Sequence, residues 1–211
     1  MFEDVVTRIE AACLRSGRNS KDVKLVAVTK GKSIAEITQS ILRHHHHVLG
    51  ENRIQEWREK ASGLDGVEWH FIGNLQRNKV KYCEGFFLIH SLNSTRLADA
   101  LEQFGARQGH IFQTLVEVNV AGELSKQGTA LTEAEALVTY AQKLRHVTVQ
   151  GLMAIAPYSE DPEDARKFFK ILRNLRDKLG LKELSIGMSG DFEVAIEEGA
   201  TIVRVGSALF T

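Results

Sequence analysis

The sequence predicts an α/β protein built as a single (β/α)8 barrel with an extra helix at its N-terminus. Eight short runs rich in β-branched and aliphatic residues alternate with stretches whose apolar residues recur at helical spacing. No stretch rich in proline, glycine or serine divides the 211 residues, and the only prolines are Pro157 and Pro162. We therefore expect one domain over residues 1–211, with a parallel sheet closed into a barrel.

The predicted strands are short, and several end at a glycine or another turn signal. They comprise residues 23–30, 47–50, 68–73, 86–92, 111–120, 147–155, 184–188 and 201–206. A doubly wound open sheet is the alternative. It usually has fewer strands, and Lys30-Gly31-Lys32 after the first strand is neither the glycine-rich turn of a dinucleotide site nor a P-loop.

Helices are predicted before and between these strands. They cover residues 1–16, 34–42, 53–61, 77–82, 97–104, 132–144, 165–179 and 192–198. Three starts carry capping signals: Ser33 with Glu36, Asn52 before the third helix, and Thr132-Glu133-Ala134-Glu135 as a capping box. Gly180 and Gly199 are suitable residues for helix C-terminal ends.

Composition excludes several classes of function. The chain has 27 basic and 27 acidic residues, so its net charge provides no steering field for nucleic acid or an anionic membrane. No apolar run approaches the roughly 18 residues of a membrane span, and the start does not resemble a signal sequence. Cys13 and Cys83 form no CxxC motif, which favours reduced thiols. We expect a cytoplasmic protein with no nucleic-acid or membrane partner; a small anionic ligand remains allowed.

Lys30 ends the first predicted strand. The carboxyl ends of strands in parallel α/β folds carry the chemistry, so Lys30 is a candidate working amine, expected to be held partly out of water. Burial is the usual way to free a lysine amine for Schiff-base chemistry. The alternative is a solvated lysine at a strand end.

Small, hydroxyl-bearing loops follow the last two strands. Ser189 lies after the seventh strand, and Gly206 and Ser207 follow the eighth, where barrels commonly hold a phosphate on backbone N–H groups, hydroxyls and a helix N-terminus. The alternative is two ordinary turns. Arg204 interrupts the apolar eighth strand, and because a buried arginine is rare without a partner, we expect it to point at a ligand.

Several motifs occur in order along the chain and carry a family resemblance. They are Val26–Lys30, Gly50-Glu51-Asn52 with Gln55-Glu56, Trp69–Gly73 with Leu75-Gln76 and Asn78-Lys79, Asn119 with Ser125-Lys126-Gly128, Gly151-Leu152-Met153, Met188-Ser189 and Arg204-Val205-Gly206. Together they resemble the YggS/PROSC family of pyridoxal phosphate homeostasis proteins, which are single barrels of the alanine racemase N-terminal type. The resemblance spans nearly the whole chain.

The resemblance implies a site for pyridoxal 5′-phosphate (PLP). It implies that Lys30 forms a Schiff base with PLP and that Arg204 faces the pyridine nitrogen. The residues implied to hold the phosphate are Ser189, Gly206 and Ser207. Those implied to lie at the barrel mouth near the ring are Asn52, His90 and Ser91.

Three classes of function stay open. We expect a monomeric carrier that holds PLP and hands it to PLP-dependent apoenzymes, without robust turnover. The first alternative is a PLP-dependent racemase or decarboxylase. Racemases of the related barrel take a second base, a tyrosine, from a C-terminal domain that these 211 residues do not include. The second alternative is a barrel enzyme for a phosphorylated metabolite with Lys30 as an aldolase-type lysine.

Histidines supply weaker candidates. His44-His45-His46-His47 is internal, and a pair such as His44 and His47 could bind a metal if they shared a helical face; a solvated surface run is the favoured interpretation. His70 and His90 lack a carboxylate or thiolate that would complete a metal site. We therefore expect no metal.

Overall fold

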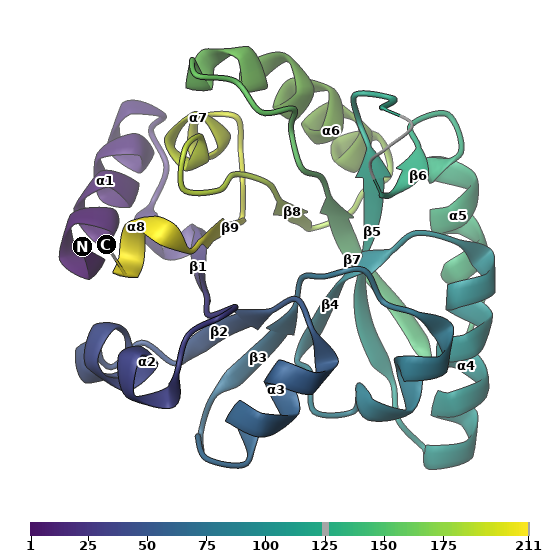
Figure 1. Ribbon diagram of the computed structural model, residues 1–211. Coiled ribbons are helices and arrows are strands. Elements are labelled where there is room, and N and C mark those ends of the chain that lie inside the picture. Colours follow the sequence, from purple (N-terminus) through teal and green to yellow (C-terminus); the bar gives the residue numbers. More distant parts are fainter. Residues whose placement is uncertain (124–126, 211) are drawn as a thin grey trace.

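The computed structural model describes residues 1–123 and 127–210, and its parallel strands close into a barrel surrounded by helices (Figure 1). The barrel strands are β1 Lys24–Val28, β2 Val48–Glu51, β3 Glu68–Phe71, β4 Leu88–Leu92, β5 Phe112–Asn119, β7 Val147–Met153, β8 Glu183–Ser185 and β9 Ile202–Val205. Their order is β4-β3-β2-β1-β9-β8-β7-β5, and pairing of β4 with β5 closes the ring. The predicted barrel and its eight strands are confirmed.

One further strand lies outside the ring. The two-residue strand β6, Thr129–Ala130, pairs with the end of β5, with Val118 opposite Thr129. The sequence did not predict it. Ser125 and Lys126, two residues of the family motif, lie outside the described residues.

Helices cover the outside of the barrel (Figure 1). The α-helices are α1 Phe2–Arg15, α2 Ile34–Ser40, α3 Ile54–Ala61, α4 Thr95–Gln108, α5 Ala134–Ala141, α6 Arg166–Lys178, α7 Phe192–Glu197 and α8 Ser207–Phe210. The 3₁₀ helices are η1 Ser20–Asp22, η2 Leu42–His44, η3 Arg77–Tyr82 and η4 Pro162–Ala165. Helix α1 precedes β1 and packs against α7 and α8, so the first helix of the chain lies beside the last one (Figure 1).

Only one of the three predicted caps forms. Ser33 and Glu36 make the reciprocal bonds of a capping box at the start of α2. Asn52 is not a cap, because α3 starts one residue later with Arg53 at the cap position and no side-chain bond. The predicted box at Thr132 is wrong: the Glu133 N–H bonds the Ala130 carbonyl in a turn after β6, and this turn delays α5 to Ala134.

Two hydrophobic cores sit on either side of the strands. The larger fills the space between the barrel and its helices. The smaller lies inside the barrel and consists of Val26, Leu88, Leu115, Met153 and Ile202. These inner residues occupy alternate strand positions, since successive side chains of a strand point to opposite faces. The inner core forms the floor beneath any ligand at the barrel mouth.

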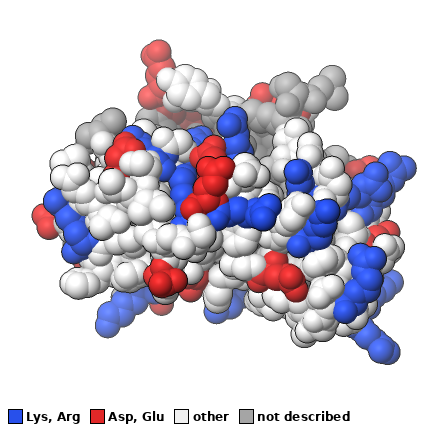
Figure 2. All heavy atoms as spheres, turned by 60° about the horizontal axis from the view of Figure 1, so that its bottom comes forward, with Lys and Arg blue, Asp and Glu red and all other residues white. Residues whose placement is uncertain are grey.

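The surface carries both signs of charge, and basic and acidic side chains are interspersed on the face shown in Figure 2. Within the described part of the chain, no helix is long and apolar enough to cross a membrane.

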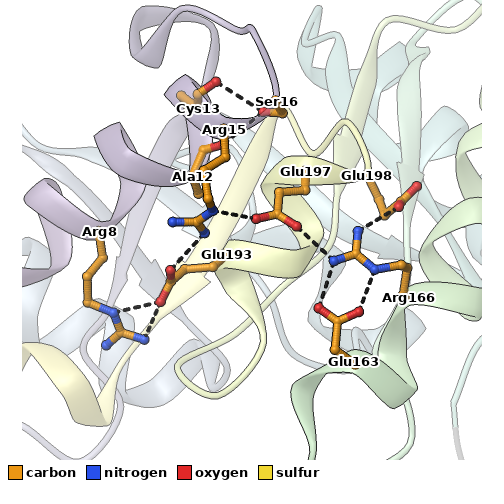
Figure 3. A network of polar contacts seen from close by, with 10 residues as sticks. All are labelled: Arg8, Ala12, Cys13, Arg15, Ser16, Glu163, Arg166, Glu193, Glu197 and Glu198. Atoms are coloured by element: carbon orange, nitrogen blue, oxygen red, sulfur yellow. Dashed lines mark hydrogen bonds and ion pairs between the residues drawn. The ribbon is translucent and has the colours of Figure 1, made fainter.

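An ion-pair network ties α7 to its neighbours (Figure 3). Glu193 accepts from Arg8 and Arg15 of α1, at 2.8 and 3.0 Å. Glu197 accepts from Arg15 at 2.8 Å and from Arg166 of α6 at 2.7 Å. The network fixes α7, and with it the loop before α7 that carries Ser189.

The histidine run connects α2 to β2. His44 stacks on Phe2 with ring centroids 4.7 Å apart, His45 adopts a left-handed conformation with φ 57°, and His46 contacts the Val48 carbonyl at 3.1 Å. The run turns at His45, so His44 and His47 do not share a helical face. The described residues contain no group of three or more side chains that could hold a metal.

Candidate functional site

A cavity of about 730 Å³ opens at the carboxyl ends of the barrel strands. Its lining comes from residues at or just after the ends of β1, β2, β3, β5, β7, β8 and β9. These residues are Val28, Lys30, Asn52, Ile72, Gly73, Asn74, Glu117, Val118, Asn119, Gln127, Ile155, Met188, Ser189, Gly190, Arg204, Gly206 and Ser207. Six of the eight residues expected at the site are therefore brought together.

Lys30 lies at the rim of this cavity, two residues beyond β1, and its side chain is exposed. The expectation that it is held partly out of water is wrong for this structure. Its position follows from strand length, because β1 ends at Val28 and the buried Thr29 is the last residue inside the wall. An exposed amine at the rim can be approached by a carbonyl compound from solvent.

A buried polar cluster holds the chain next to Lys30. The Thr29 hydroxyl donates to Glu51 Oε1 at 2.6 Å, and Lys60 Nζ of α3 donates to the same oxygen and to the Thr29 carbonyl at 2.7 Å. Glu51 is fully buried and Lys60 is 7% exposed. The cluster joins the ends of β1 and β2 to α3 and fixes the backbone from which Lys30 projects.

The two loops after β8 and β9 meet at the cavity. Ser189 Oγ accepts a hydrogen bond from the Gly206 N–H at 3.2 Å, and Asp191 accepts from the Met188 N–H at 2.6 Å, which closes the first loop. Gly206 packs tightly on β1, since an added Cβ would lie 3.3 Å from Val28 Cβ. Ser207 is exposed and starts α8. Hydroxyls and small residues thus gather on one side of the cavity.

Arg204 lies at the bottom of the cavity and is only 4% exposed. Its Nη1 donates to the Ser185 carbonyl at 2.8 Å and to Ser185 Oγ at 2.6 Å, and its Nη2 donates to the Ala154 carbonyl at 3.0 Å. Burial lowers its pKa to about 10, an effect that the nearby carboxyls of Asp191 and Glu117 oppose. No carboxylate of the described residues hydrogen-bonds it, so a buried cation faces the cavity without a counter-ion in contact.

A guanidinium has five N–H groups, and three are engaged by Ser185 and Ala154. The remaining Nε–H and one Nη2–H of Arg204 have no protein partner among residues 1–123 and 127–210. Arg204 lines the cavity, so a ligand atom that accepts hydrogen bonds could bind these two donors there.

Glu117 on β5 is a cavity residue that the sequence reasoning missed. It is 6% exposed, its Oε2 has no hydrogen-bond partner among the described residues, and burial raises its pKa to about 7. Four strand steps separate β5 from β1 in either direction around the ring, so Glu117 lies across the barrel from Lys30. The alternation Gln113, Leu115, Glu117 could have predicted its inward orientation.

Asn52 also lines the cavity, and its buried Oδ1 accepts no hydrogen bond from residues 1–123 or 127–210. His90 and Ser91, by contrast, are not part of the lining. Strand β4 extends to Leu92, so both residues lie within a strand rather than after it, and both are buried. The expectation that they lie at the barrel mouth is wrong.

Comparison with known proteins gives a consistent assignment. The family model described as alanine racemase, N-terminal domain, matches residues 8–211. A pyridoxal phosphate homeostasis protein of Aquifex aeolicus is 45% identical over 98% of this chain and 94% of its own length. A pyridoxal phosphate homeostasis protein of Deinococcus radiodurans is 43% identical over 98% of this chain and 97% of its own length.

Among solved structures, PipY of Synechococcus elongatus with PLP bound is 31% identical, with a TM-score of 0.83 over 98% of this chain and all of PipY. The barrel fold, the sequence motifs and the similar proteins all point to the same family over nearly the full length of the sequence. The chain therefore belongs to the family of pyridoxal phosphate homeostasis proteins.

Proposed function

We propose that this protein binds PLP in the cavity at the barrel mouth, holds it as a Schiff base on Lys30, and hands it to PLP-dependent apoenzymes as a monomer in the cytoplasm. The observation that carries the proposal is a set of polar groups around one exposed lysine that have no hydrogen-bond partner among the described residues. They are two N–H groups of Arg204 and the buried oxygens of Asn52 and Glu117. The names of the relatives and the PLP in PipY support the choice of ligand.

The residues present fit this cofactor. PLP has a phosphate at one end, a pyridine nitrogen on the ring and an aldehyde that condenses with an amine. Ser189, Gly206 and Ser207 would hold the phosphate through hydroxyl and backbone N–H donors. Lys30, which follows β1 next to β9, would supply the amine.

Arg204 would donate to the pyridine nitrogen. Because an arginine remains protonated and has no acceptor, it can only bind this nitrogen in its unprotonated form. PLP supplies an electron sink to enzymes that use it, and an unprotonated ring is a poorer sink. This argument favours storage and transfer of the cofactor over catalysis.

A racemase is the second candidate, and Glu117 is the observation that favours it. A racemase needs a base on each side of the substrate carbon, and Glu117 has a pKa near neutrality across the barrel from Lys30. No tyrosine occurs among the described residues that line the cavity. Glu117, however, lies in the wall of the barrel beside Arg204 rather than above the mouth, so the carrier function is the better fit.

The experiment is a titration of the purified protein with PLP, followed by its absorption spectrum. We expect a visible band in the wild type, and its loss in Lys30→Ala with a return to the spectrum of free PLP. Lys32→Ala is the matched control, since Lys32 is a neighbouring lysine that pairs with Glu36 outside the cavity. A band that persists in Lys30→Ala and disappears in Lys32→Ala would overturn the assignment.

A further inference from the structure

A column of polar side chains crosses the interior of the barrel beneath Arg204. His70 Nε2 contacts Glu68 Oε1 at 2.9 Å, and His70 Nδ1 contacts His90 Nε2 at 2.8 Å. His90 Nδ1 contacts Ser185 Oγ at 2.9 Å, and Ser185 Oγ accepts from Arg204 at 2.6 Å. The column joins five residues of four different strands, β3, β4, β8 and β9, and is embedded in the apolar inner core.

The chemistry of the two ends fixes the direction of every bond. Arg204 can only donate, so Ser185 Oγ accepts from it. The Glu68 carboxylate can only accept, so His70 donates to it from Nε2. With both rings neutral, His70 Nδ1 accepts from His90 Nε2, and His90 Nδ1 accepts from the Ser185 hydroxyl. Each histidine is then in its Nε2–H tautomer, and every bond points from Arg204 toward Glu68.

Burial supports the neutral form of both rings. His70 and His90 are fully buried, and burial lowers the pKa of His70. Burial, together with the nearby His70, Arg204 and Lys24, lowers the pKa of His90 well below its usual range. At the other end, the hydrogen bond from His70 and the Lys24 ammonium hold the pKa of Glu68 at about 2. The acceptor that ends the column is therefore an anion at any physiological pH.

The Glu68 end reaches the opposite side of the barrel. A second cavity, of about 750 Å³, opens there between the amino ends of the strands, and Lys24 and His70 line it. The column thus spans the barrel from this cavity to the one that contains Lys30.

We infer that Glu68, His70, His90 and Ser185 are positioning residues that orient the Arg204 guanidinium toward the pyridine nitrogen of PLP. The inference rests on the proposed function, since it concerns how Arg204 recognises the cofactor. A lone pair of Ser185 Oγ points at Arg204 only while the Ser185 hydroxyl donates to His90 Nδ1. His90 Nδ1 is an acceptor only while the ring proton of His90 is on Nε2 and is donated to His70. Because Arg204 does not give up its proton, the column transmits orientation and not a proton.

The test compares PLP with 1-deazapyridoxal phosphate, in which a carbon replaces the ring nitrogen. Only PLP can accept from Arg204, so the ratio of the two dissociation constants reports this one bond. We expect the wild type to prefer PLP by about tenfold or more, as for a hydrogen bond to a charged group, and Arg204→Gln to lose most of that preference.

His90→Phe breaks the column without touching the cavity, and we expect its preference for PLP to fall to within about threefold of that of Arg204→Gln. His90→Asn keeps an acceptor near the Nδ1 position, so it should recover part of the preference. Glu68→Gln, at the far end, should give a smaller loss in the same direction. Thr114→Val is the matched control: it removes a hydrogen bond of another buried barrel residue, from the Thr114 hydroxyl to the Thr148 carbonyl at 3.0 Å.

Binding of the deaza analogue shows that each variant is folded with an intact cavity. One outcome would overturn the inference and leave the proposed function standing: the wild type prefers PLP, Arg204→Gln removes this preference, and His90→Phe and Glu68→Gln leave it unchanged. Equal binding of both compounds by the wild type would overturn the role of Arg204 itself, and this inference with it.

Discussion

Arg204 and Ser185 lie on the neighbouring strands β9 and β8 and share two hydrogen bonds, from Nη1 to the Ser185 carbonyl at 2.8 Å and to Ser185 Oγ at 2.6 Å. Both bonds are made by Nη1. The Nε–H and one Nη2–H of Arg204, which make no hydrogen bond within the described residues, are available to a ligand in the cavity that Arg204 lines. A buried cation is costly unless it is paired or bound, so the arrangement is most easily explained by a ligand that completes it.

The hydroxyls of the two phosphate loops give the first prediction. Replacing Ser189 and Ser207 by alanine should weaken binding of PLP far more than binding of unphosphorylated pyridoxal, because each hydroxyl bond to a phosphate is worth about 1.5–3 kcal/mol. Titration of both compounds measures the difference, with the exposed Ser62→Ala as control. Equal weakening of both ligands would place the phosphate elsewhere.

Glu117 should make the ligand-free protein less stable as the pH rises. Its pKa is about 7 in the folded state and about 4.5 in the unfolded chain, so between these values the folded state binds more protons and stability falls with rising pH. Above pH 7, burial of the ionised Glu117 lowers the free energy of unfolding by at most about 3 kcal/mol, and Glu117→Gln removes this cost. Urea unfolding should find the variant more stable than the wild type at pH 8, and the difference should narrow to about 1 kcal/mol at pH 5.

The exposed Glu84→Gln provides the control for this experiment, with no pH-dependent gap expected. A stability difference between Glu117→Gln and the wild type that is the same at pH 5 and pH 8 would contradict the burial of an ionisable Glu117.

Lys60 should be essential to the stability of the wall beside Lys30. Lys60→Met leaves the fully buried Glu51 without its cation, and losing one partner of a buried pair costs about 3–5 kcal/mol. Adding Glu51→Gln removes the stranded charge and should recover part of that loss. Urea unfolding of both variants measures the effect; a double variant no more stable than Lys60→Met alone would show that the pair is not the cause.

The carrier function predicts slow chemistry on amino acids. With PLP bound, single enantiomers of amino acids in deuterated water should exchange their α-protons much more slowly than about 1 per second, a rate at the low end of typical enzymes. Proton NMR follows the exchange. Exchange of the α-proton at or above that rate in the wild type, together with loss of this exchange in Glu117→Gln, would favour the racemase instead.

The barrel could be predicted from the sequence because each strand is a short apolar run, and each outer helix repeats its apolar residues at a helical period. The same local logic located Arg204, Ser189, Gly206 and Ser207, since they follow or interrupt the last two strands. The position of Lys30 at the end of a strand was predicted correctly, but the exposure of its side chain was not. Burial of a residue at a strand end depends on which loops from other strands cover that residue.

The polar interior could not be predicted in the same way. Glu68 and His70 lie on β3 and His90 on β4, about 90 residues or more before Ser185 and Arg204, and only closure of the barrel brings these residues together. His90 was therefore expected at the mouth. The alternation of residues in β3 and β5 could have indicated which side chains point inward, but not their partners.

The central claim is that Lys30 holds PLP, and the most direct test is borohydride reduction of the PLP-loaded protein followed by peptide mapping by mass spectrometry. Reduction converts a Schiff base into a stable secondary amine, so the label marks the lysine that carried the cofactor. The account predicts one dominant label, on Lys30, that is absent from the Lys30→Ala variant. A label on another lysine, or an unlabelled Lys30 in a protein that has bound PLP, would contradict it.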